Sequence, residues 1–142
     1  MIFKQYIEQN IKDKPFFRKS FIHKSYKNIK PPCDTNETLE MIGDKALDLV
    51  LYEHLYNTSE GKITKEEMDD IRKEKTSKKG LALIYDRYGL LKYTDVFDPK
   101  QPINDEVKHN IVESLAGAIF LVEGYKIANE LLMKFMLYPD MS

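Results

Sequence analysis

Residues 36–52 decide the fold of this chain, and they read NETLEMIGDKALDLVLY. Apolar side chains recur in this stretch at steps of three and four residues, which is the period of an α-helix with one buried face. These side chains are Leu39, Ile42, Ala46, Leu47, Val50 and Leu51. The stretch therefore predicts a helix that packs its apolar face into the core.

A second stripe on the same helix is acidic. Glu37, Glu40, Asp44 and Asp48 follow one another at spacings of three, four and four residues, so their carboxylates lie one turn apart. Like charges at such spacings repel by roughly 0.2–0.5 kcal/mol per pair on an isolated helix. A hard divalent cation bound by carboxylate oxygens would turn that repulsion into attraction, which favours a magnesium or manganese site. The alternative interpretation is an ordinary solvated helix face.

Length and composition indicate one globular domain. The chain has 142 residues, of which 42% are hydrophobic and 32% charged, and this is enough to bury a core. Cys33 is the only cysteine, which excludes an internal disulfide and favours a reducing compartment, the cytoplasm or the nucleus. The longest apolar runs, such as residues 115–122, are too short to span a bilayer, so we expect no membrane association.

Charge is unevenly distributed although the formal net charge is only −1. Residues 1–32 and 72–100 are basic, whereas residues 33–71 and 101–142 are acidic. Basic segments beside an acidic one could bind phosphates around a metal centre. The alternative interpretation is that the charges serve only solubility. The second basic segment holds a cluster that is either a phosphate-gripping edge or a solvated helix junction. It consists of Arg72, Lys73, Lys75, Lys78 and Lys79.

Two helices are predicted before the central one, over residues 3–11 and from Pro15, with apolar side chains continuing to Tyr26. We interpret His23 as a hydrogen-bonded structural histidine, because no paired nucleophile and acid can be placed beside it. Asp34 stands three residues before Glu37 in a capping-box-like arrangement, which starts the central helix near residue 35 or 36. Glu37 therefore has a competing structural role.

Further helices are predicted after the central helix ends near Tyr56. They run from residue 64 to about 75, from 76 or 77 to the glycine at 89, from 104 or 105 to at least 121, and from 125 to about 136. A loop separates the second and third of these, over residues 93–102. Gly117 is small enough for its helix to pack closely on another. No convincing strand is found, so the predicted fold class is all-α, as a single helical domain.

Three sequence blocks resemble the catalytic domain of the ribonuclease III family. Residues 36–44 (NETLEMIGD) resemble the signature helix of that family, residues 21–26 (FIHKSY) its upstream segment, and residues 113–121 (ESLAGAIFL) its second metal-binding helix. The order and spacing of the blocks also fit, over roughly residues 3–136. The resemblance implies that residues 1–142 form the ribonuclease III catalytic domain, with no double-stranded-RNA-binding domain in this chain.

The resemblance also implies a function: a homodimeric endonuclease for double-stranded RNA, dimerised through the signature helix. By matching position, Glu40, Asp44, Asn110 and Glu113 are the catalytic and metal-coordinating residues, and Glu37 and Glu60 are further acidic positions. The cofactor is Mg²⁺, with Mn²⁺ as a substitute. In the family reaction a metal-activated water attacks the phosphodiester and leaves a 5′-phosphate and a 3′-hydroxyl. RNA is recognised by its A-form shape, its phosphates and its 2′-hydroxyls.

Asn110 departs from the family pattern, which has an aspartate at this position. An amide still offers an oxygen, but the site loses one negative charge, so magnesium binding should weaken. Three accounts are open: a pseudo-nuclease that keeps RNA binding, an active enzyme in which Glu106 takes over part of the role, or an engineered substitution. The leading hypothesis is the endoribonuclease, and the alternative is a catalytically inactive RNA-binding or scaffold protein. A plain helical domain without an RNA role comes third.

Overall fold

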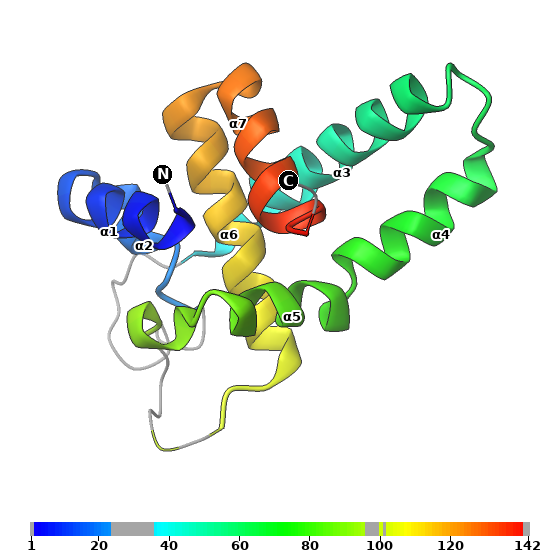
Figure 1. The fold of residues 1–142 in the computed structure, drawn as a ribbon. Coiled ribbons are helices and arrows are strands. Elements are labelled where there is room, and N and C mark those ends of the chain that lie inside the picture. Colours follow the sequence, from blue (N-terminus) through cyan, green and yellow to red (C-terminus); the bar gives the residue numbers. More distant parts are fainter. Residues whose placement is uncertain (1, 24–35, 96–99, 101, 141–142) are drawn as a thin grey trace.

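Helix α3, Glu37–Thr58, crosses helix α6, Asp105–Glu123, and the C-terminal half of α3 extends away from this crossing (Figure 1). The computed structural model describes residues 2–23, 36–95, 100 and 102–140. The remaining elements are α1 (Phe3–Asp13), α2 (Pro15–Lys19), α4 (Lys65–Thr76), α5 (Lys78–Arg87), the 3₁₀ turn η2 (Leu90–Tyr93), α7 (Tyr125–Leu132) and the π-helical turn η3 (Met133–Leu137). Within the described ranges no strand is present, only an isolated bridge between Ile22 and Asp95. The predicted all-α class is confirmed.

Local capping residues set several helix ends where the sequence predicted them. The Thr64 hydroxyl accepts a hydrogen bond from the Glu67 backbone and the Glu67 carboxylate accepts one from the Thr64 backbone, which completes the expected capping box. Asn104 accepts a bond from the Val107 backbone at 3.0 Å and starts α6. Gly89 has a φ of 60°, the left-handed conformation that follows the end of α5.

Two glycines let α3 and α6 touch backbone to backbone. A Cβ atom added at Gly43 would lie 1.6 Å from the carbonyl oxygen of Glu113 and 2.8 Å from the backbone nitrogen of Gly117. A Cβ atom added at Gly117 would lie 2.1 Å from the carbonyl oxygen of Leu39. The close packing predicted for Gly117 is therefore confirmed, and Gly43 provides the matching surface on α3.

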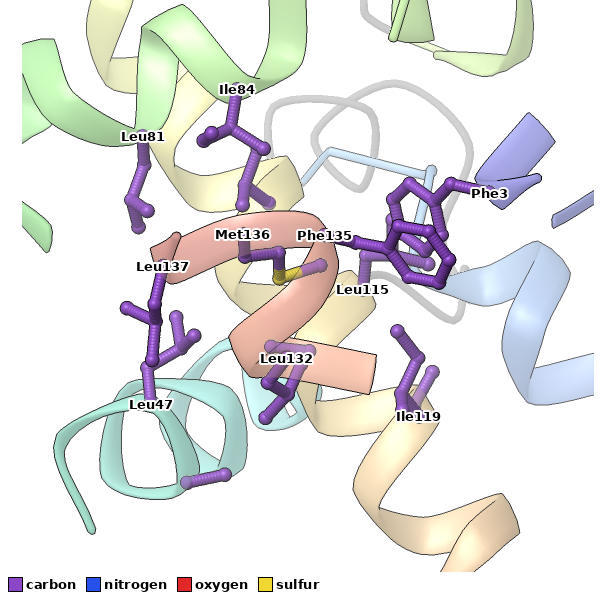
Figure 2. Packing of buried hydrophobic residues seen from close by; sticks show 14 of the residues in the cluster. Phe3, Leu47, Leu81, Ile84, Leu115, Ile119, Leu132, Phe135, Met136 and Leu137 are labelled. Atoms are coloured by element: carbon purple, nitrogen blue, oxygen red, sulfur yellow. The ribbon is translucent and has the colours of Figure 1, made fainter. Parts of the chain in front are cut away.

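The C-terminal turn η3 closes the core from one side (Figure 2). Figure 2 shows Phe135 beside Phe3 of α1, and their rings stack with centroids 4.4 Å apart. Leu137 extends toward Leu47 of α3, and all of these side chains are at least 93% buried. One turn thus joins the first helix and the central helix to the same core, which stabilises the crossing of α3 and α6.

Some predicted helix boundaries are wrong. Helix α2 ends at Lys19 instead of continuing toward Tyr26, because the next backbone groups bond to distant segments: the Ser20 carbonyl accepts from Ser114, and the Ile22 carbonyl accepts from the Asn36 backbone. Glu37 is the first residue of α3, so it does not hold the third helical position of a capping box.

Some predictions fall on residues that the structure does not describe. They concern residues 24–35, which include Cys33 and Asp34, and most of the loop over residues 96–101. Among the helices that are described, none is both long enough and apolar enough to cross a membrane.

Candidate functional site

The candidate site lies where α3 and α6 cross. Glu40 and Asp44 lie one turn apart on α3, while Asn110 and Glu113 lie one turn apart on α6. The contact between Gly43 and the backbone of Glu113 fixes the distance between the two helices at this level. Carboxylates far apart in the sequence are therefore brought together by main-chain packing.

Glu113 is the most buried acid of the site, with 5% of its surface exposed. Burial, a hydrogen bond with Asp44 and the negative charges of Asp44, Glu40 and Asp48 raise the pKa of Glu113 to about 9. At neutral pH the Glu113 carboxyl is therefore protonated and donates a hydrogen bond to Asp44. The acids of the two helices thus interact directly, and the structure brings Glu40, Asp44 and Glu113 together.

The amide of Asn110 occupies a point where three acceptors converge. Its nitrogen donates toward Oε1 of Glu40 at 3.1 Å, Nδ1 of His109 at 3.1 Å and the backbone oxygen of Glu106 at 3.3 Å. This orientation is favoured because the opposite one places the amide oxygen among acceptors only. An amide has two N–H groups, so three acceptors share two donors at a residue that is only 4% exposed.

Two histidines flank this amide, and sequence reasoning did not place either of them at the site. Nδ1 of His109 also lies 3.4 Å from Oε1 of Glu113. Nε2 of His23 lies 3.5 Å from the other end of the Asn110 amide, and the His23 backbone N–H donates to the Asp95 carbonyl at 3.0 Å. The prediction of a hydrogen-bonded histidine at position 23 is confirmed. The spacing of His109 and Glu113, one helical turn, was the signal that could have identified His109.

A chain of buried hydrogen bonds links Asn36, Ser114 and Ser20 next to the site. The Asn36 amide donates to the Ser114 hydroxyl at 3.1 Å, and that hydroxyl donates to the Ser20 carbonyl at 2.6 Å. Asn36 and Ser114 are 0% exposed. Because Asn36 precedes α3 and Ser114 follows Glu113, the contact ties both acid-bearing helices to the end of α2. Sequence reasoning missed this contact because it joins three distant segments.

Asp48 extends the acidic stripe of α3 by one turn. Its Oδ1 atom is buried and has no hydrogen-bond partner within the described residues. Burial and the charge of Asp44 raise the pKa of Asp48, while Arg72 of α4 and Lys45 lower it. Negative charge is therefore crowded along this side of α3.

The donor set fits a hard divalent cation in its chemistry. Oxygen donors predominate, burial and the acidic neighbours raise the pKa of Glu113, and an amide supplies a partial positive charge among three acceptors. Within the described ranges, no three side chains of histidine, cysteine, aspartate or glutamate are arranged to hold an ion as they stand. Asp44 has room to move, because its side chain is 42% exposed and its ion pair with exposed Lys45 spans 3.6 Å.

The two further acidic positions lie apart from this cluster. Glu37 is exposed at the start of α3. Glu60 follows the other end of α3, in a turn where its φ is 55°, about 24 Å from Asp44 at the helical rise per residue. A role for Glu60 at this centre would need a second copy of the chain to bring it there.

The five cations of residues 72–79 do not act as one group. Arg72 is near Asp48 and Tyr52 of α3, and its charge lowers the pKa of both. The Lys75 ammonium lies over the Tyr138 ring, 4.3 Å from its centroid. The other three are exposed at the junction of α4 and α5, namely Lys73, Lys78 and Lys79.

An apolar surface lies on the opposite side of α3 from the core. Met41 is 71% exposed, Leu49 is 56% exposed, and Leu121 of the neighbouring α6 is 49% exposed. Between them is a groove lined by Met41, Ile42, Lys45, Ala46, Leu49 and Phe120. Exposed apolar residues grouped in this way mark an interaction surface.

Comparison with known families gives one match over most of the chain. The sequence model of the family described as Ribonuclease-III-like matches residues 13–139. Among curated relatives, a ribonuclease 3 from Zunongwangia profunda is 30% identical over 90% of this chain and 53% of its own length. A ribonuclease 3 from Nitratiruptor is 28% identical over 94% of this chain and 59% of its own length. The chain thus spans between half and three fifths of these relatives.

Solved structures give the same fold. Two solved structures of the nuclease domain of ribonuclease III from Campylobacter jejuni superimpose with TM-scores of 0.81 and 0.80. They are 24% and 23% identical to this chain, and each match covers at least 96% of both chains. One of them is described by the flexibility of a region involved in dimer formation.

Proposed function

Because this chain belongs to the ribonuclease-III-like family, we propose that it is an endoribonuclease that hydrolyses double-stranded RNA and leaves 5′-phosphate and 3′-hydroxyl ends. One observation carries the proposal: Glu113 is buried against Glu40 and Asp44 where α3 and α6 cross, and their charges contribute to the pKa of about 9. A protein core rarely holds so many acids together without a cationic partner. The site lies on the helices that the family resemblance assigns to the chemistry.

Glu40, Asp44, Asn110 and Glu113 would hold the cation, which we propose to be Mg²⁺ with Mn²⁺ as a substitute. When bound, such an ion supplies positive charge that stabilises the phosphodiester transition state and makes a neighbouring water more acidic. Glu113 would have to be ionised to hold the ion, since a coordinating carboxylate carries no proton. Asn110 would offer its amide oxygen to the ion, and Glu40 Oε1 would then be free of its hydrogen bond to the amide.

The partner that completes the molecule is a second copy of this chain, joined through α3. The apolar surface with Met41, Leu49 and Leu121 supports this proposal, because a monomer gains nothing by exposing these side chains. Met41 and Leu49 lie on α3, the helix through which the family resemblance implies a homodimer, and Leu121 lies on the neighbouring α6. A dimer would also bring a second set of acids, including Glu37 and Glu60 of that copy, into the molecule.

Double-stranded RNA would be bound through its phosphates, by exposed cations that include Lys73, Lys78 and Lys79. Arg72 and Lys75 have protein contacts and contribute less. We further propose that residues 1–142 act as the catalytic unit and that the protein works in a reducing compartment, the cytoplasm or nucleus.

Cleavage of a perfect RNA duplex tests the proposal. The chain is compared with Asn110→Asp and Glu113→Ala, each with Mg²⁺, with Mn²⁺ and with a chelator. We expect metal-dependent cleavage that rises in Asn110→Asp, because the added charge strengthens metal binding, and that is lost in Glu113→Ala. If Asn110→Asp is folded and dimeric but shows no metal-dependent cleavage, the nuclease proposal is wrong.

A second candidate function is a non-catalytic RNA-binding or scaffold protein. The amide of Asn110 favours it, because its N–H groups already satisfy Glu40 Oε1 and His109 Nδ1 without an ion. This function predicts duplex binding that survives chelation and thermal stability that does not respond to divalent metals. The same samples distinguish the two candidates.

A further inference from the structure

His109 stands beside two of the site's acids and has no role in the function proposed above. Its Nδ1 atom lies 3.4 Å from Oε1 of Glu113 and 3.1 Å from the amide of Asn110. Two donors bound to one ion at about 2.0–2.2 Å each lie about 3 Å apart. The separation of His109 Nδ1 and Glu113 Oε1 is close to this value. His109 and Glu113 are one turn apart on α6, as are the paired ligands of helical metal sites.

Three hydrogen-bond acceptors face the amide nitrogen of Asn110. Its nitrogen is 3.1 Å from both His109 Nδ1 and Glu40 Oε1, and the Glu106 carbonyl is a third acceptor at 3.3 Å. In this orientation of the amide, Nδ1 of His109 is one of the three acceptors, which corresponds to the tautomer with its proton on Nε2. A cation bound among these groups, with the amide N–H groups turned away, would take an imidazole nitrogen and a carboxylate oxygen that the N–H groups now satisfy.

We propose that His109 is a metal ligand of this site and gives the chain a preference for Mn²⁺ over Mg²⁺. This inference rests on the metal site of the proposed function and specifies its ligands. Magnesium demands oxygen donors and gives up its water reluctantly, whereas imidazole nitrogen binds first-row transition ions well. The neutral Asn110 removes the charge that Mg²⁺ requires, and His109 adds a donor that Mg²⁺ does not use.

Electron spin echo spectroscopy of the whole chain loaded with Mn²⁺ tests the assignment, because it detects a coordinated ¹⁴N nucleus directly and needs no catalysis. The chain has three histidines, so three single substitutions assign the signal. We expect a ¹⁴N modulation that is lost in His109→Ala and retained in His23→Ala and His54→Ala. His54 is the matched control, since its ring packs near Tyr138, with centroids 5.1 Å apart, away from the site.

Calorimetric titration with Mn²⁺ and with Mg²⁺ provides the second measurement. We expect Mn²⁺ to bind at least about tenfold more tightly than Mg²⁺, and His109→Ala to lose about tenfold in Mn²⁺ affinity with at most about a twofold change for Mg²⁺. His109→Gln, which keeps a side chain of similar reach, should resemble His109→Ala. Thermal unfolding establishes that each variant is folded, and a variant that fails to fold is replaced by the other.

Three results would overturn the inference: bound Mn²⁺ without a ¹⁴N modulation, a modulation that disappears in His23→Ala but not in His109→Ala, or no Mn²⁺ binding at millimolar concentration. The first two leave the proposed nuclease intact, because an oxygen-only or His23-containing site can still support cleavage. Absence of metal-dependent cleavage in Asn110→Asp would instead refute the proposed function. The two failures are therefore distinguishable.

Discussion

Replacing Gly43 by alanine tests whether the crossing of α3 and α6 depends on main-chain contact. In an isolated helix the substitution stabilises by about 1 kcal/mol, since alanine is the better helix former. In this protein the new Cβ atom would lie 1.6 Å from the Glu113 carbonyl oxygen, about 1.8 Å short of ordinary van der Waals contact. The obstructing atoms belong to the backbone, so no side-chain rotation relieves the clash.

The two helices must therefore separate, and the cost exceeds the gain in helix propensity. Overpacking of a core typically costs about 1–3 kcal/mol, and more where the obstacle is rigid. We expect Gly43→Ala to lower the free energy of unfolding by about 3 kcal/mol, a large part of the total for a domain of this size. The measurement is urea unfolding followed by circular dichroism.

Gly89→Ala is the control for this substitution. Gly89 has a positive φ of 60°, but a Cβ atom there would meet nothing within 4 Å. Its cost should come from the left-handed backbone alone, about 1 kcal/mol. If Gly43→Ala were neutral or stabilising, or cost no more than Gly89→Ala, the reasoning about main-chain contact would be refuted.

Four further predictions concern the site and its surroundings. In metal-free protein, Glu113 keeps a proton that the unfolded chain loses near pH 4.5. The contribution of Glu113 to the free energy of unfolding is therefore complete below that pH and is lost as the pH rises through about 9, by up to about 1.4 kcal/mol per pH unit. Urea unfolding across this range should show the slope, and Glu113→Gln should remove it. Asn110→Asp should lower the melting temperature of the metal-free protein, because it adds a charge to a buried acidic cluster. Added Mn²⁺ should raise the melting temperature of this variant again. Calorimetry that shows no such metal-dependent recovery would contradict the prediction. Asn36→Ala should cost about 1–3 kcal/mol, since it leaves the buried Ser114 hydroxyl without its donor, whereas Asn57→Ala, at an exposed position, should cost far less in the same assay. Leu49→Glu should convert a dimer into a folded monomer in sedimentation analysis, because it places a charge on the apolar surface of α3, and an unchanged dimer would show that the partner binds elsewhere.

Most of the fold follows from local sequence signals. Thr64 with Glu67, Asn104 and Gly89 mark helix ends through hydrogen bonds and conformations that involve only neighbouring residues. The end of α2 could not be predicted in this way, since the backbone beyond it bonds to Ser114 and to segments far along the chain. The π-helical turn η3 likewise depends on packing against distant helices.

In the candidate site too, local spacing predicted some residues, whereas contacts between distant segments could not be predicted. Spacing alone placed Glu40 and Asp44 on one face of a helix, and resemblance to a family added Asn110 and Glu113. The contact of His109 with these groups depends on how the two helices cross and on the rotation of an amide, neither of which a one-dimensional pattern contains. The sequence signal closest to this contact is the spacing of His109 and Glu113, which places both side chains on one face of their helix as possible metal ligands.

The amide of Asn110 has a consequence for whether the crossing of α3 and α6 needs a cation in order to form. Because its N–H groups already serve Glu40, His109 and the Glu106 carbonyl, the crossing of α3 and α6 can form before any ion arrives. An aspartate at the same position would make that step less favourable in the absence of a cation. The chain can thus complete its fold without a cation, and the proposed ion would bind afterwards to a site that is already formed.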